Sequence, residues 1–154
     1  MHVLKKISLF LFFTLFQIGC ITGLPKSEVP RGFASYPDTK EFKAVSPDGV
    51  MYRIRTEKNE PFADLSFWKK AMKKRMLDAG YNFVGESEIT AQNREGYLIE
   101  LTAPLGNKDY SYLIAIFLGE QKNIVIVESC GEISRFKIKR DDIIVAIKGI
   151  KFAD

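Results

Sequence analysis

Histidine is almost absent from this chain. The one histidine among its 154 residues is His2, which lies in an N-terminal segment that we expect the mature protein to lose. The rest of the chain therefore has no imidazole for a Ser-His or Cys-His pair and none for a zinc site. Most hydrolase and zinc-enzyme mechanisms are excluded, although chemistry based on carboxylates or lysines is not. We expect a protein that is not an enzyme and that holds no metal and no cofactor.

The chain also has no clear membrane-spanning run. Its most apolar stretch, residues 7–18, is shorter than the roughly 20 residues that cross a bilayer. Lys5 and Lys6 precede this stretch, and the small residue Gly19 follows it. A basic start, an apolar stretch of about 7–15 residues and a small residue are typical of an export signal. Because Cys20 comes next, residues 1–19 resemble a bacterial lipoprotein signal, in which the cysteine becomes the acylated first residue.

Three fates of this segment stay open: cleavage with lipidation of Cys20, an uncleaved anchor, and ordinary secretion. The two residues before Gly19 depart from the commonest lipoprotein pattern, and no charge follows Cys20 as far as residue 24. All three fates place the bulk of the chain outside the cytoplasm, since Lys5 and Lys6 favour staying inside. By the same resemblance, an isoleucine and not an aspartate at position 21, directly after the cysteine, favours sorting to the outer membrane. We expect a domain in the periplasm or at the cell surface, anchored in the bacterial cell envelope.

Excess charge and cysteine are scarce as well. The net charge of +4 falls by two to +2 once Lys5 and Lys6 are removed, which is too small an excess to indicate nucleic acid as a partner. Cys20 and Cys130 are the two cysteines. If Cys20 is acylated, Cys130 has no internal disulfide partner, and a lone thiol is best tolerated when buried. We therefore expect Cys130 to be buried and structural.

The remaining chain is divided into a tether and one domain. Residues 20–38 begin with the lipidated cysteine, contain three prolines and show no helical or strand period, so they predict a flexible or extended tether reaching up to about 60 Å. Residues 39–154 have the usual size of a single domain. Within them, 42–45 and the alternating run 50–56 predict strands, the second with one wet face.

A helix follows these strands, and then a series of strands and a second helix. Asp64 is a good N-cap and Gly80 a good residue after the C-terminus, and apolar residues recur between them at three- and four-residue steps. Period-two runs predict strands at 81–84 continuing raggedly to 89, at 97–103, at 110–118 and, after a hairpin loop, at 124–129. The 110–118 run is apolar on both sides, which indicates a central strand. Asp141 or Asp142 is expected to cap the last helix, with Ile143, Ile144, Ile147 and Ile150 facing the sheet.

This order predicts an α+β fold in which an antiparallel sheet of about six strands packs with two main helices. Four features carry a resemblance to the PsbP/Mog/DcrB-like superfamily: Asp48-Gly49-Val50 opening a strand, Gly80-Tyr81 ending a helix, Gly96-Tyr97 entering a strand, and the terminal helix 142–150. The resemblance covers about residues 39–152 and implies an α/β/α sandwich. The superfamily includes a photosystem subunit, a Ran-binding factor and bacterial lipoproteins, without a shared catalytic set. Cystatin-like and NTF2-like sheets are structural competitors.

Two groups of residues are candidates for binding. Trp68, Tyr110 and Tyr112 form a possible ligand or partner surface, although core packing explains them as well. The first helix also carries a basic face that would attract anionic headgroups, although a solvated surface is the more common meaning of such a run. Its lysines are Lys69, Lys70, Lys73 and Lys74.

Acidic residues offer weaker candidates. Glu128, Glu132, Asp141 and Asp142 lie around the last loop but lack the spacing of a calcium loop, and basic residues separate them. Glu100 with Glu95 or Glu128 is a conceivable carboxylate pair for glycoside chemistry. An exposed sheet face explains these residues at least as well.

The sequence thus favours an envelope-anchored lipoprotein that acts as a non-catalytic binding or assembly factor. Its expected partners are the membrane, reached through the lipid, and another envelope protein. The alternative is a carrier or sensor of a small apolar ligand held between the sheet and the helices.

Overall fold

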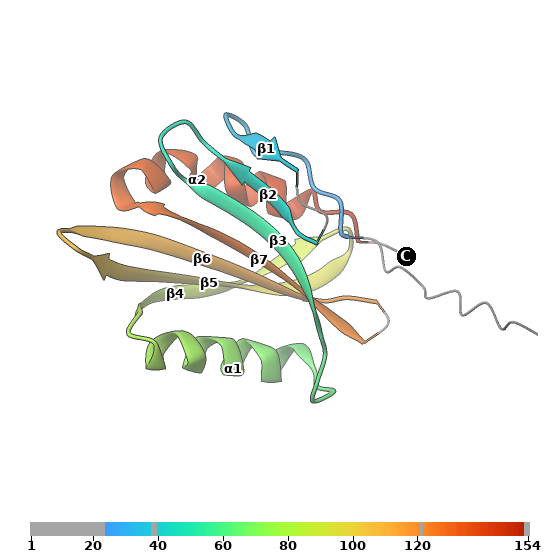
Figure 1. The fold of residues 1–154 in the computed structure, drawn as a ribbon. Helices are drawn as coiled ribbons and strands as arrows, with labels where there is room; N and C mark the ends of the chain where they lie inside the picture. Colours follow the sequence, from blue (N-terminus) through green and yellow to red (C-terminus); the bar gives the residue numbers. More distant parts are fainter. Residues whose placement is uncertain (1–23, 38–39, 121, 153–154) are drawn as a thin grey trace, which may run out of the picture.

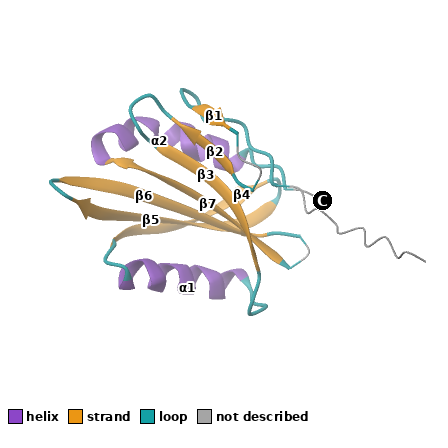
Figure 2. Ribbon diagram, viewed as in Figure 1, coloured by secondary structure: helices purple, strands orange, loops and turns teal. Residues whose placement is uncertain are grey.

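One antiparallel sheet of seven strands organises the fold, with a helix on each of its faces (Figures 1 and 2). The computed structural model describes residues 24–37, 40–120 and 122–152. The strand order across the sheet is β1-β2-β3-β7-β6-β5-β4. In chain order the elements are β1 (Ala34–Tyr36), β2 (Phe42–Val45), β3 (Met51–Lys58), α1 (Leu65–Asp78), β4 (Asn82–Ala91), β5 (Arg94–Leu105), β6 (Lys108–Leu118), β7 (Asn123–Glu132) and α2 (Ile133–Lys148). The predicted α/β/α arrangement is confirmed, with seven strands in place of about six.

The alternation seen in the sequence sets which face each side chain occupies. Val50, Tyr52 and Ile54 are buried on the α2 side of the sheet, where they join the larger apolar core. Residues 113–117 of β6 are all buried, because α1 packs on one face of that strand and α2 on the other. The expectation of an inner strand with both faces covered is therefore confirmed, with β7 lying beside it at the centre of the sheet.

Helix α1 begins and ends where the sequence predicts. The carboxylate of Asp64 accepts a hydrogen bond from the Phe67 amide at 2.8 Å, which caps the first turn. Gly80 ends the helix with φ of 90°, a conformation that glycine adopts without strain. Met72 and the half-buried Trp68 pack against the smaller core on this face of the sheet. Strand β4 is ragged because a bulge lies between Phe83 and Gly85.

Helix α2 starts nine residues earlier than predicted, at Ile133. Strand β7 passes directly into the helix at Glu132, which makes no side-chain capping bond. The early start buries Phe136 in the core, and Asp141 and Asp142 lie within the helix instead of capping it. The prediction that Ile143, Ile147 and Ile150 face the sheet is confirmed, since all three are buried, and Ile144 is partly buried.

Part of the expected tether belongs to the domain. Residues 34–36 pair with β2 as strand β1, and Lys26 exchanges two backbone hydrogen bonds of 2.8 Å with Lys151. Pro25 and Pro30 are buried. The ordered chain therefore includes residues well before Thr39. Cys20 and the signal lie outside the described residues, and no helix within the described ranges is long and apolar enough to cross a membrane.

Candidate functional site

The α1 face of the sheet is covered unequally. Helix α1 packs mainly on β5 and β6, and its apolar cluster includes β7 at Ile124 and Ile126. The rest of this face, formed by β3 and the second half of β7, lies beyond the main contacts of the helix. We call this part the open sheet face and define it by the following side chains, which the strand register places together: Met51, Arg53, Arg55, Tyr112, Glu128 and Cys130. Met51, 45% exposed, is its most accessible apolar residue.

Glu128 is the centre of the open sheet face. Its Oε2 accepts hydrogen bonds from Arg53 Nε at 3.0 Å and Arg55 Nε at 2.9 Å, and also pairs with Arg53 Nη2. Its Oε1 accepts the hydroxyl of Tyr112 at 2.7 Å. Only 12% of the Glu128 side chain and 15% of the Arg55 side chain are exposed. Cross-strand neighbours thus hold one carboxylate between two guanidinium groups and a phenol.

The electrostatics of this network favour an ionised Glu128 carboxylate, a neutral Tyr112 phenol and a neutral Cys130 thiol. Burial opposes ionisation of Glu128, but hydrogen bonds from Arg55, Arg53 and Tyr112 outweigh it and hold its pKa below the ordinary value. Burial, together with the Glu128 charge, raises the pKa of Tyr112. The same two causes raise the pKa of Cys130. Neither the phenol nor the thiol is therefore activated as a nucleophile.

The aromatic residues singled out in the sequence lie on the α1 side of the sheet, Trp68 and Tyr112 against one apolar cluster and Tyr110 on the same face of β6 as Tyr112. Tyr112 makes an edge-to-face contact with Tyr81, just beyond the end of α1, with ring centroids 5.3 Å apart. Trp68 lies in the first half of α1, where its Nε1 donates to the Oδ1 of buried Asn59 at 2.6 Å. Tyr110 is half-buried and lies opposite Glu132. Of the three candidates, Tyr112 alone joins the network on the open sheet face.

The basic face of α1 is largely paired. Lys69 and Lys73 both reach Glu86 on β4, at 2.9 and 3.2 Å, and Lys74 pairs with Asp78 at 2.7 Å. Lys70 is exposed. The lysines that point towards the sheet therefore bind a carboxylate of the protein itself.

The candidate carboxylate pair for glycoside chemistry is wrong. Glu100 lies on the α2 face of the sheet, where it forms an ion pair with Arg140. Glu128 is on the opposite face, and Glu95 shares that opposite face with Tyr97. A sheet separates the carboxylates, so they cannot flank one bond of a substrate.

The acidic group around the last loop is also dispersed. Glu132 pairs with Lys108 at 2.7 Å, and Asp142 pairs with Arg31 at 3.1 Å. Asp141 is exposed. Among the residues that the structure describes, no group of three histidine, cysteine or acidic side chains is arranged to hold a metal ion. Cys130, expected to be buried, is half-buried and free.

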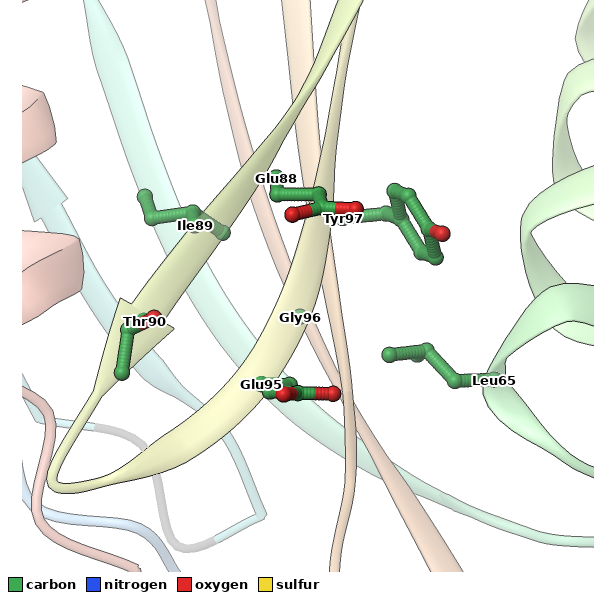
Figure 3. A pocket seen from close by; sticks show the side chains of 7 residues that line it. All are labelled: Leu65, Glu88, Ile89, Thr90, Glu95, Gly96 and Tyr97. Carbon is green, nitrogen blue, oxygen red and sulfur yellow. The ribbon is translucent and has the colours of Figure 1, made fainter.

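A pocket of about 140 Å³ lies between the start of α1 and the β4–β5 hairpin. Figure 3 shows Tyr97 and Leu65 on its helix side, with Glu88 and Glu95 beside them. Pockets for drug-sized ligands are larger, about 300–1,000 Å³, and mostly apolar. This pocket therefore does not suit a carrier of apolar ligands.

The two arginines were missed as site residues by the sequence analysis. Alternation in the 50–56 run does place Arg53 and Arg55 on the wet face of their strand. Their shared partner Glu128 is more than 70 residues away in the chain, and only the pairing of β3 with β7 brings it near. No local pattern could have signalled the network.

Two helices on opposite faces of a seven-stranded antiparallel sheet define an α+β sandwich. This sandwich has the PsbP-like fold, as the sequence resemblance implied. No family model and no curated protein sequence matches the chain.

Solved structures share the fold at low sequence identity. LpqN, described as involved in cell envelope biogenesis of Mycobacterium tuberculosis, superposes with a TM-score of 0.67 at 11% identity, covering 89% of this chain and 88% of its own. The PsbP protein CyanoP of Synechocystis gives 0.58 at 7% identity, covering 87% and 95%. PA94 of Pseudomonas aeruginosa, of unknown function, gives 0.59 at 10% identity, covering 82% and 95%.

Proposed function

We propose that this protein is a lipid-anchored accessory factor of the bacterial cell envelope, which acts by binding another protein through the open sheet face. The observation that carries the proposal is the Glu128 network beside exposed Met51. Arginine, tyrosine and methionine are enriched at protein interfaces. A fixed array of charges adds specificity for a partner of complementary charge.

The chemistry of the network supports recognition over catalysis. Catalytic groups need a pKa near the working pH and access to a substrate. Here the carboxylate of Glu128 is held ionised by its donors, while the pKa of Tyr112 and of Cys130 is moved away from neutrality. These groups suit a stable surface that presents charge without reacting.

The proposed location rests on the sequence and on one structural neighbour. The N-terminal layout of residues 1–20 resembles a lipoprotein signal, and LpqN is described as involved in cell envelope biogenesis. The proposed anchor is a lipid on Cys20, in the outer membrane, which leaves the domain in the periplasm or at the cell surface. Labelling with a palmitate analogue should mark the wild type and spare Cys20→Ala; equal labelling would contradict the anchor.

Photo-crosslinking tests the binding surface directly. A photoreactive amino acid at Met51 should capture one reproducible envelope protein in native membranes. The matched control places the same probe at Ile138, an exposed apolar residue of α2 that is 74% exposed. Folded Arg53→Gln should weaken capture at Met51. Identical products from both probe positions, or capture insensitive to the arginine, would contradict a role for the open sheet face.

The apolar-ligand alternative gains no support from the pocket of Figure 3 or from the pocket beside the β5–β6 turn. The pocket of Figure 3 is small and carries two carboxylates. Beside the β5–β6 turn, near Tyr110, a second pocket is lined mainly by polar and charged residues, which are Asn107, Lys108, Asp109, Glu132 and Ser134, with Ile133.

A further inference from the structure

Leu24, the first residue that the structure describes, is only four residues after the proposed lipid attachment. A tether over residues 20–38 would have allowed the domain about 60 Å of travel. The structure instead describes the chain from Leu24 onward, and Lys26 is held by two backbone hydrogen bonds to Lys151. From Cys20 to Leu24 the chain spans at most about 14 Å. A lipid at Cys20 therefore keeps one end of the domain beside the bilayer.

That end is defined by a chain of contacts, and we call it the anchored end. Lys26 pairs with Lys151, the Phe152 amide donates to Gln92 Oε1 at 2.9 Å, and Arg94 donates to the Leu118 carbonyl at 2.7 Å. The entering chain, the end of α2 and the β4–β5 turn thus lie together, as Figure 1 shows. The β5–β6 turn lies at the other end of β5, whose 12 residues extend about 35–40 Å.

Exposed lysines gather at the anchored end. Lys26, Lys148 and Lys151 are exposed around the entering chain. Lys122 is exposed beside the start of β7, where its carbonyl accepts the Asn59 amide at 2.7 Å. Glu28, Glu60 and Glu95 are exposed near these lysines, as is Lys58, and Glu120 pairs with Arg94. The balance of these side chains remains positive, which favours an anionic surface.

We infer that the anchored end is a membrane-contact surface, in which Lys26, Lys122, Lys148 and Lys151 lie against anionic headgroups of the bilayer that holds Cys20. This inference rests on the proposed lipid anchor. It replaces the lysine face of α1 as the membrane-facing surface, because Lys69 and Lys73 bind Glu86. With the anchored end against the bilayer, strands β3 and β7 extend away from the membrane. The open sheet face is then accessible to a partner.

The test measures distance from the bilayer at the two ends of the domain. Full-length lipidated protein with Cys130→Ser is placed in phosphatidylethanolamine–phosphatidylglycerol vesicles that contain a headgroup-linked quencher. A fluorophore is attached at Lys122→Cys or, as the matched control, at Asn107→Cys in the β5–β6 turn. We expect quenching about fivefold stronger at position 122, given the length of β5. Equal quenching, or stronger quenching at 107, would overturn the inference.

Two controls separate this inference from its premise. Flotation with the vesicles reports the anchor alone: if the wild type does not float, or if Cys20→Ala floats equally, the proposed anchor fails. In protein that floats, Lys148→Glu should reduce quenching at position 122. Lys137→Glu, on an exposed residue near the start of α2, should leave it unchanged. An equal effect of both charge reversals would show that net charge alone acts, against a specific contact surface.

Discussion

Replacing Glu128 with glutamine removes the charge at the centre of the open sheet face and keeps the side-chain shape. Oε2 of Glu128 receives donors from two arginines and Oε1 receives one from Tyr112. Losing one member of a buried ion pair costs about 3–5 kcal/mol, and a hydrogen bond to a charged group about 1.5–3 kcal/mol. Because 37% of the Arg53 side chain is exposed and solvated, we take a value below the range for a fully buried pair. The expected loss is about 2–3 kcal/mol.

Thermal or urea unfolding at pH 7 measures this loss, which corresponds to a melting point about 10 °C lower for a domain of this size. The pKa of Glu128 is depressed in the folded state, so its contribution is complete above its unfolded pKa. It disappears as the pH falls through the folded pKa, below about 4.5. The gap in stability between wild type and variant should therefore close in acid.

The matched control is Glu120→Gln. The carboxylate of Glu120 also pairs with an arginine, but 52% of its side chain is exposed. Exposed pairs contribute about 0–1 kcal/mol, so this variant should unfold close to the wild type. If Glu128→Gln is as stable as the control at pH 7, or if its deficit does not shrink in acid, the network does not hold a buried ionised carboxylate as argued.

Three further predictions follow from single contacts. Asn59→Ala removes the partner of the Trp68 indole, so it should cost about 2 kcal/mol and shift the emission of this only tryptophan. Gly96→Ala would place a methyl group 2.5 Å from an aromatic ring of β6, so it should destabilise the domain by about 1–3 kcal/mol in urea unfolding. The control Gly85→Ala places its methyl group where nothing lies within 4 Å, so it should be neutral or stabilise the domain by up to about 1 kcal/mol. Cys130 has a raised pKa because of its burial, so in alkylation assays near pH 8 it should react more slowly in the folded protein than in the urea-unfolded chain, and equal rates would refute this.

The parts of the fold that the sequence predicted are those governed by local periodicity. The alternation in residues 50–56 and the capped repeat between Asp64 and Gly80 each depend on neighbours within a few positions. Strand β1 was not predicted, because its three residues are all exposed and therefore show no alternation of apolar and polar side chains. The start of α2 was misplaced because no turn residue or side-chain cap marks it. Its position is set by burial of Phe136 in the core.

Charge was harder to interpret than apolar pattern, because its meaning depends on partners remote in sequence. The run of lysines in α1 is conspicuous locally, yet Glu86 from β4 pairs with two of them. Lys26 and Lys151 are inconspicuous in the sequence, yet an antiparallel bridge places them side by side. A lysine contributes to membrane attraction only if its charge is free and near the bilayer. The short span from Cys20 to Lys26 favours the second pair for nearness to the proposed anchor, and both of its lysines are exposed, even though the first pair has the stronger sequence pattern.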